Sequence, residues 1–312
     1  MDMTERSDIA AAIERLCSLH DGDSGVLDVI KCGRAAIPAL CTVLFQREPS
    51  GLFATRCRAV QALAALKAHD PLVQFLSDGH VAADPVERMG DEAVMDTAAR
   101  ALAKGRRDDV AFHTLLRLAE ARPYLSGVIE ALGALERTEA IPVLAGALTE
   151  DGSRQAAAAA ILQLGRAALP TLIPIAKAGG PFPAYESHVS RKKRKGVLEL
   201  IETIGIRTKD WPSLRSLVRD SDPQVAFVAC RICMEFGPRR ERSGAERRMG
   251  QLLLQSDAKL EDEIETYLGL QPVRMAAGDD NPSRAGAGTS SAMRHLLQGI
   301  TRFLRGIFRL DH

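Results

Sequence analysis

Apolar residues recur at helical spacing along most of the chain, and the stretch from Glu139 to Gly179 shows this pattern most clearly. After Arg154, small or apolar residues follow at positions +3, +4, +7, +8 and +10, and Gly165 follows at +11. This spacing is typical of an amphipathic helix that ends at a glycine. The flanking segments, Glu139–Asp151 and Arg166–Gly179, resemble each other. The pattern therefore predicts pairs of helices that pack on one another.

The same register recurs about every 34 residues, which is the period of two-helix repeats. A second apolar helix is expected after each first helix. Three second helices open with a similar tripeptide that places proline in the first turn, where a missing N–H is tolerated. Pro174 lies deeper and should delay or kink its helix. The first helices are expected to start at Gly22, Arg56, Val94, Leu125, Arg154, Arg194 and Ala226, and the tripeptides are Ala36–Pro38, Ala140–Pro142 and Ala168–Pro170.

These repeats resemble HEAT repeats. The D-x-x-R of Asp151–Arg154, followed by AAAAAILQLG, is similar to the short HEAT subtype named after phycobilisome lyases. The resemblance covers roughly Gly22 to Leu254 and implies an all-α, right-handed α-solenoid of about seven degenerate repeats. It also implies a ladder of turn Asp and Arg residues between neighbouring repeats. The ladder should be interrupted, since Arg56, Arg154 and Arg194 match the arginine position whereas Val94, Leu125 and Ala226 do not.

Both ends of the predicted solenoid look like caps. Asp8–His20 reads as a capping helix with Ser7 as its N-cap, and Lys259–Leu268 as a last helix with a polar outer face. Gly179–Ser190 is expected to form an exposed loop between two repeats. The predicted organisation is therefore a solenoid over residues 1–275, a Gly-, Ala- and Ser-rich flexible linker over 276–291 and a helix over 292–312.

The final segment, Met293–Leu310, has an apolar stripe at helical spacing and a cationic opposite side. Such a helix can lie in the surface of an anionic membrane. It can instead dock into a groove of a partner protein, or fold back onto the solenoid. Gly299 and Gly306 weaken the helix by ~1 kcal/mol each, so it would fold on binding. Its candidate contact residues are Arg294, Leu296, Leu297, Ile300, Arg302, Phe303, Leu304, Arg305, Ile307, Phe308 and Arg309.

Two basic clusters are candidates for an anionic partner. The alternative for the first cluster is a solvated helix start, and its Arg194 already belongs to the repeat pattern. The clusters would merge into one patch if both lie on the same edge of the solenoid. Neither contains aromatic residues for base stacking, so binding to nucleic acid would depend on the phosphate backbone and on salt. The first cluster is Arg191, Lys192, Lys193 and Lys195, and the second is Arg239, Arg240 and Arg242, with Arg247 and Arg248 following.

Composition limits the function classes. Aromatic residues make up only 4% of the chain, which favours close-packed helices. The net charge is +1, so an electrostatic argument for a nucleic-acid or membrane partner must come from local clusters of charge. The polar start predicts no signal peptide, and no uncharged apolar run reaches the ~20 residues of a membrane span. Cys230 and Cys233 form a CxxC inside a helical pattern, where packing explains them better than redox chemistry. Trp211 is expected to pack between repeats at the start of a second helix.

No catalytic, cofactor or metal motif stands out: the histidines lack paired spacing, and the common nucleotide-binding signatures are absent from the sequence. The sequence favours a non-catalytic binding scaffold in the cytoplasm that holds a protein partner on its concave surface. The C-terminal helix would bring it to the inner face of a membrane. The competing hypothesis is a HEAT-like protein or DNA-repair enzyme that binds nucleic acid through the basic clusters.

Overall fold

A computed structural model describes residues 3–46, 53–179, 186–255 and 257–269. Every regular element within these residues is a helix, so the described chain is all-α, as the sequence pattern predicts. The described residues divide into two compact units, one ending at Leu217 and one beginning at Val218, called the N-terminal and C-terminal units below. This division falls inside the segment 1–275 that the sequence assigns to one domain. The linker and the C-terminal helix lie outside the described residues.

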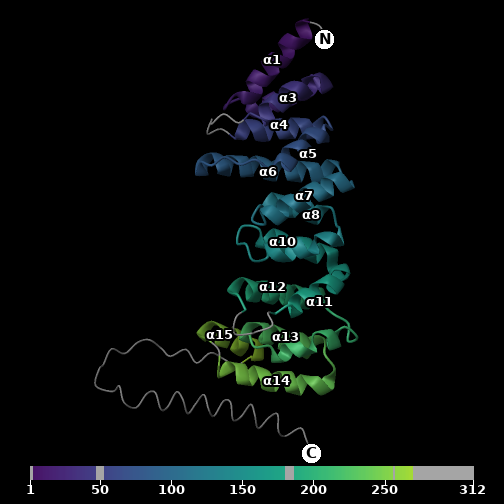
Figure 1. The fold of residues 1–312 in the computed structure, drawn as a ribbon, viewed down its shortest axis with the longest axis vertical. Coiled ribbons are helices and arrows are strands. Elements are labelled where there is room, and N and C mark those ends of the chain that lie inside the picture. The colour runs from purple at the N-terminus through teal and green to yellow at the C-terminus, as the bar shows by residue number, and fades with distance from the viewer. Residues whose placement is uncertain (1–2, 47–52, 180–185, 256, 270–312) are drawn as a thin grey trace, which may run out of the picture. The chain divides into compact units, whose positions relative to one another are not determined.

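The N-terminal unit alternates first and second helices. Each first helix from α2 to α10 contacts the next first helix, and each second helix from α5 to α9 contacts the next second helix (Figure 1). The helix α1 (Met3–Cys17) packs on α2. The first helices are α2 (Gly22–Lys31), α4 (Ala54–Ala65), α6 (Pro85–Gly105), α8 (Ser126–Ala134), α10 (Arg154–Leu164) and α12 (His188–Ile204). The second helices are α3 (Ile37–Leu44), α5 (His69–Asp78), α7 (Asp109–Ala121), α9 (Ile141–Ala147) and α11 (Leu169–Lys177).

Small residues set the spacing of α8 and α10. A Cβ on Gly133 of α8 would lie 2.6 Å from the Cβ of Ala160 in α10, so only glycine fits there. Ala157, Ala160 and Ile161 are buried on the facing side of α10. The alanine-rich pattern from Arg154 therefore reflects close helix packing.

Two matching turns lead into second helices. Gly33–Ala36 and Gly165–Ala168 both read GRAA and form 3-10 turns, and both begin with a glycine of positive φ (66° and 56°). Pro38 and Pro170 then occupy the first turn of the helix that follows, as the sequence predicts. The glycine reverses the chain direction, and the proline starts the second helix.

Several local predictions are wrong. Ser7 lies inside α1, which begins at Met3 because residues 3–7 contain no helix breaker. Pro174 does not delay α11, which begins at Leu169. The second helix expected to start at Trp211 is replaced by two 3-10 segments, η5 (Trp211–Ser213) and η6 (Arg215–Arg219). Residues 188–190 of the loop expected over Gly179–Ser190 are helical, and Ser187 caps α12. Residues 180–185 of that loop lie outside the described residues.

The C-terminal unit contains α13 (Pro223–Phe236), α14 (Arg239–Leu253) and α15 (Ala258–Leu268). The helix α14 packs against both α13 and α15. Asp222 caps α13 and Asp257 caps α15 through side-chain bonds to backbone N–H groups. The helix expected over Lys259–Leu268 is therefore present.

Candidate interaction surfaces

The three arginines that match the repeat pattern make the same contact. The Nε atoms of Arg56, Arg154 and Arg194 donate to the carbonyls of Leu44, Leu148 and Ala176, at 3.1, 3.1 and 2.9 Å. Each carbonyl lies at the C-terminal end of the preceding second helix, where backbone acceptors lack a helical partner. A cation also stabilises the negative end of the helix dipole. The arginine pattern in the sequence therefore marks helix caps.

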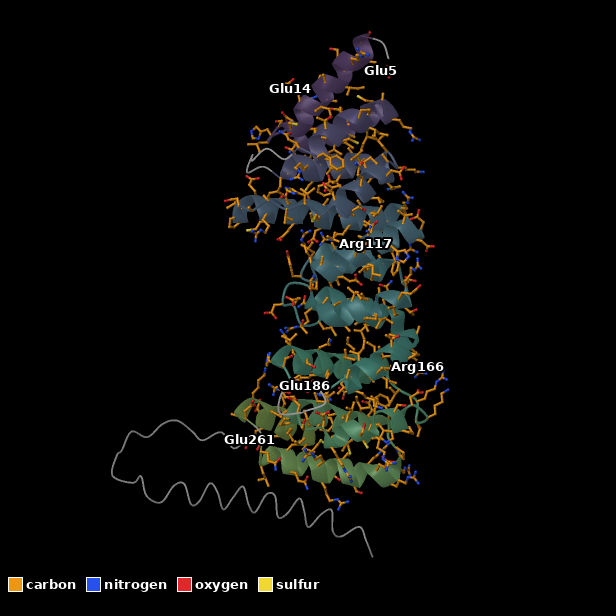
Figure 2. The ribbon with its side chains drawn as sticks, in the orientation of Figure 1. Glu5, Glu14, Arg117, Arg166, Glu186 and Glu261 are labelled. Carbon is orange, nitrogen blue, oxygen red and sulfur yellow. The ribbon has the colours of Figure 1, made fainter. Side chains whose placement is uncertain are left out.

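Arg194 is the most deeply placed of the three. Its side chain is 2% exposed and forms an ion pair of 2.8 Å with Glu186, whose side chain is 3% exposed. The Ser190 hydroxyl donates to the other oxygen of Glu186 at 2.6 Å. The contacts of Arg194 with Ala176 and Glu186 hold α11 and the start of α12 together on either side of residues 180–185. Figure 2 labels Glu186 beside α12.

Inter-repeat ion pairs also occur in the turns that join first to second helices. Arg106 pairs with Asp70 of the preceding second helix, and Arg137 pairs with Asp109 in the same way. The Arg137 guanidinium lies 4.1 Å from the ring centroid of Phe112. Neither arginine is predicted as a contact residue from the sequence. The sequence signal for these pairs is a cation just after a first helix, with an acid about one repeat earlier.

In the first basic cluster, in α12, Lys192 and Lys195 contact other groups of the protein. Lys192 donates to the Thr149 carbonyl at 2.7 Å and to Asp151 at 3.2 Å. The Lys192 contact lowers the pKa of Asp151, which also pairs with Arg154. The Nζ atom of Lys195 lies 3.8 Å from Oε1 of Glu199. Arg191 is exposed, and Lys193 is half-buried with no described partner. Lys192 thus joins α12 to the turn that precedes α10.

The second basic cluster, in α14, is open. Arg239 and Arg240 are exposed in the first turn and pair with no described acid. Arg242 is half-buried, and its guanidinium bonds the carbonyls of Gly237 and Glu235 at 3.3 and 3.4 Å. The two clusters lie in different units, so their expected merger into one patch remains a prediction.

The solvent-exposed residues of the second helices form a further candidate surface, called the row below. Five fully buried leucines occupy equivalent positions, and the residues two before and two after each of them are exposed or half-exposed. On α7 this row presents His113 and Arg117, of which Figure 2 labels Arg117, whereas on α9 and α11 it presents proline and glycine. The leucines are Leu40, Leu72, Leu115, Leu144 and Leu172, and the flanking pairs are Pro38 and Thr42, Asp70 and Gln74, His113 and Arg117, Pro142 and Gly146, and Pro170 and Pro174.

The CxxC cysteines are buried in α13. Burial raises the pKa of Cys230 to about 12 and that of Cys233 to about 11. Both thiols therefore stay protonated at neutral pH, which disfavours nucleophilic or redox chemistry. Trp211 is also buried, in η5.

Burial raises the pKa of two described carboxyl groups, Asp96 in α6 and Glu265 in α15. Asp96 also accepts a hydrogen bond from the Gly127 N–H at 3.0 Å. This bond caps the first turn of α8, and a Cβ on Gly127 would lie 2.7 Å from the side chain of Asp96. Asp96 therefore has a structural role in joining α6 to α8. No group of three metal-ligating side chains occurs in the part of the chain that the structure describes.

One described stretch, Arg154–Lys177, is long and apolar enough to cross a membrane. It consists of two helices, α10 and α11, which the turn at Gly165 separates. Each of them is shorter than the ~20 residues of a membrane span. The predicted contact residues of the C-terminal helix, from Arg294 to Arg309, lie outside the described residues.

A scan against protein-family models finds no match for the chain, and a search of curated proteins finds none either.

Proposed function

We propose that this protein is a non-catalytic scaffold built as a right-handed solenoid of HEAT-like two-helix repeats. The proposal rests on the helix contacts of the N-terminal unit. Each first helix from α2 to α10 contacts the next first helix, and each second helix from α5 to α9 contacts the next second helix. The repeated cap from Arg56, Arg154 and Arg194 supports equivalent repeats, since each arginine binds the end of the preceding second helix. Stacked repeats of this kind present an extended surface for a partner.

The binding surface is the row of exposed residues on the second helices. Its chemistry changes along the row, because α5 and α7 present polar and charged side chains while α9 and α11 present proline and glycine. A protein partner can make polar contacts at one end and close apolar contacts at the other. In a test, a photoreactive residue replaces Arg117 on this row or Gln61 on the exposed side of α4, in the full chain within cells. The proposal expects specific protein adducts from position 117 and none from position 61, and equal labelling contradicts it.

The C-terminal helix at Met293–Leu310 recruits the scaffold to an anionic membrane surface in the cytoplasm. The alternation of apolar residues with Arg294, Arg302, Arg305 and Arg309 supports this part of the proposal. Flotation of the full chain and of a truncation ending at Ala277, with neutral and with anionic vesicles, is the test. Flotation of the full chain alone, and only with anionic lipid, is the expected result. If neither form floats, the membrane anchor is ruled out.

A further inference from the structure

The solvent face of α14 carries arginines and no acid. Arg240, Ser243, Arg247, Gln251 and Leu254 follow one another at i, i+3, i+7, i+11 and i+14, so they form one stripe along the helix and its C-cap. All five are exposed. The buried residues Ala245, Met249 and Leu252 lie on the opposite side, toward α13 and α15. The acids of this helix, Glu241 and Glu246, are half-buried and lie off the stripe.

Three features of the stripe suit a flat anionic surface. Arg239 extends the positive charge at the start of the helix and, like Arg240, is exposed and pairs with no described acid. A Cβ on Gly244 or Gly250 would meet nothing within 4 Å, so no neighbouring group covers the helix there. These two residues also have no side chain that projects between the arginines. Leu254, at the far end, is 72% exposed, the most exposed large apolar side chain in the described chain. Cations followed by an exposed leucine match the headgroup layer and the acyl boundary of a bilayer.

We propose that this arginine face, formed by Arg239, Arg240, Arg247 and Leu254, makes a second contact with anionic lipid, in addition to the contact proposed for the C-terminal helix. The inference extends the proposed membrane recruitment, and its lipid contact is separate from that of the helix. A single weak anchor binds membranes reversibly, and stable attachment takes a second signal such as a basic patch. The C-terminal segment follows the face in the amino-acid sequence, so both signals lie after residue 238. Nucleic acid is the less suitable partner, because the face has no aromatic side chain for base stacking.

The test uses the full chain and compares two variants that lose three positive charges each. R239Q/R240Q/R247Q removes the arginine face. The matched control, R34Q/R166Q/R207Q, removes three exposed arginines of the N-terminal unit that pair with no described acid.

Binding to vesicles of phosphatidylcholine alone, or with about 30% phosphatidylserine, is measured by titration and co-flotation. Because each arginine near such a surface contributes a factor of about five, loss of the face should weaken anionic binding by about tenfold to a hundredfold. The control should bind within about threefold of wild type, and no variant should change binding to the neutral vesicles. Equal binding by the face variant and the control overturns the inference.

A third variant, L297E/F303E, separates this inference from the proposed anchor. If this variant binds like wild type and the face variant does not, the C-terminal anchor fails and the arginine face stands. If L297E/F303E abolishes binding and the face variant matches the control, the anchor stands and the face fails. Loss of binding in both variants supports two cooperating contacts. No binding by the wild type overturns both.

Labelled single-stranded and duplex DNA form the last arm of the test. If the face variant loses affinity for DNA while its vesicle binding matches the control, the face is a site for nucleic acid and the lipid assignment is wrong. The lipid assignment expects the opposite pattern.

Discussion

The two basic clusters look alike in sequence and differ in the structure. The cluster in α12 places Arg194 in a buried ion pair and commits Lys192 and Lys195 to neighbouring groups. The cluster in α14 leaves Arg239 and Arg240 exposed and without a described acid. The difference follows from the groups that each run meets, since Lys192 and Arg194 bind carbonyls after α9 and in α11, whereas the exposed arginines of α14 meet no described acid. A run of cations therefore indicates a binding surface only after its internal partners are counted.

The largest expected effect comes from removing the buried cation of α12. Arg194→Gln leaves the Glu186 carboxylate buried without its partner and the Ala176 carbonyl without its cap, so we expect a loss of about 3–5 kcal/mol in the free energy of unfolding. Urea unfolding of the full chain, followed by circular dichroism, measures it. Lys193→Gln, a neighbour with no described partner, should change stability by less than about 0.5 kcal/mol.

The double variant E186Q/R194Q sharpens this prediction. It removes both charges, so it should lose less stability than Arg194→Gln alone. If Arg194→Gln costs less than about 1 kcal/mol, the buried pair does not hold α11 and α12 together as described.

The equivalent arginines should give smaller losses in the order of their exposure. Arg56 is 16% exposed and pairs with Asp91, and Arg154 is 45% exposed and pairs with Asp151. We expect Arg56→Gln to cost about 1.5–3 kcal/mol, because it removes charged hydrogen bonds that are partly buried. Arg154→Gln should cost less than about 1 kcal/mol, because solvent screens its pair. The same unfolding measurement checks both, and a reversed order would show that burial does not set the strength of the cap.

The smallest effect is expected on α14. R239Q/R240Q/R247Q removes exposed side chains, so the free energy of unfolding should change by less than about 0.5 kcal/mol per site. Cys230 and Cys233 in α13 report whether α14 stays packed. Burial raises the pKa of both thiols, which keeps them protonated at pH 8, and they should resist labelling by a thiol reagent until denaturant is added. Labelling of either thiol in the folded variant would show that the arginines hold the C-terminal unit together.

Much of the fold follows from the sequence because its signals are local. The apolar stripe from Arg154, the prolines of the second helices and the glycine turns each depend on residues within one or two turns of helix. The side-chain contacts that join one helix to another are less visible in the sequence. No local signal pairs Arg106 with Asp70, or shows that Glu186 enters the core to meet Arg194.

The candidate surfaces divide in the same way. The sequence identifies the arginines of α12 and α14, since charge is visible in the residues themselves. Their availability depends on neighbouring helices, and so does the open stripe that joins Arg240 to Leu254. The row on the second helices becomes visible only once the buried leucines are known.

Arginine footprinting on the wild-type chain tests the membrane account most directly. The chain is treated with an arginine-selective dicarbonyl reagent, alone and with anionic vesicles, and the modification of each arginine is read by mass spectrometry. The account predicts that vesicles slow modification of Arg239, Arg240 and Arg247 several-fold and leave Arg34, Arg166 and Arg207 unchanged. Equal protection at both sets, or protection only in the N-terminal unit, would contradict the assignment of α14 as the lipid-facing surface.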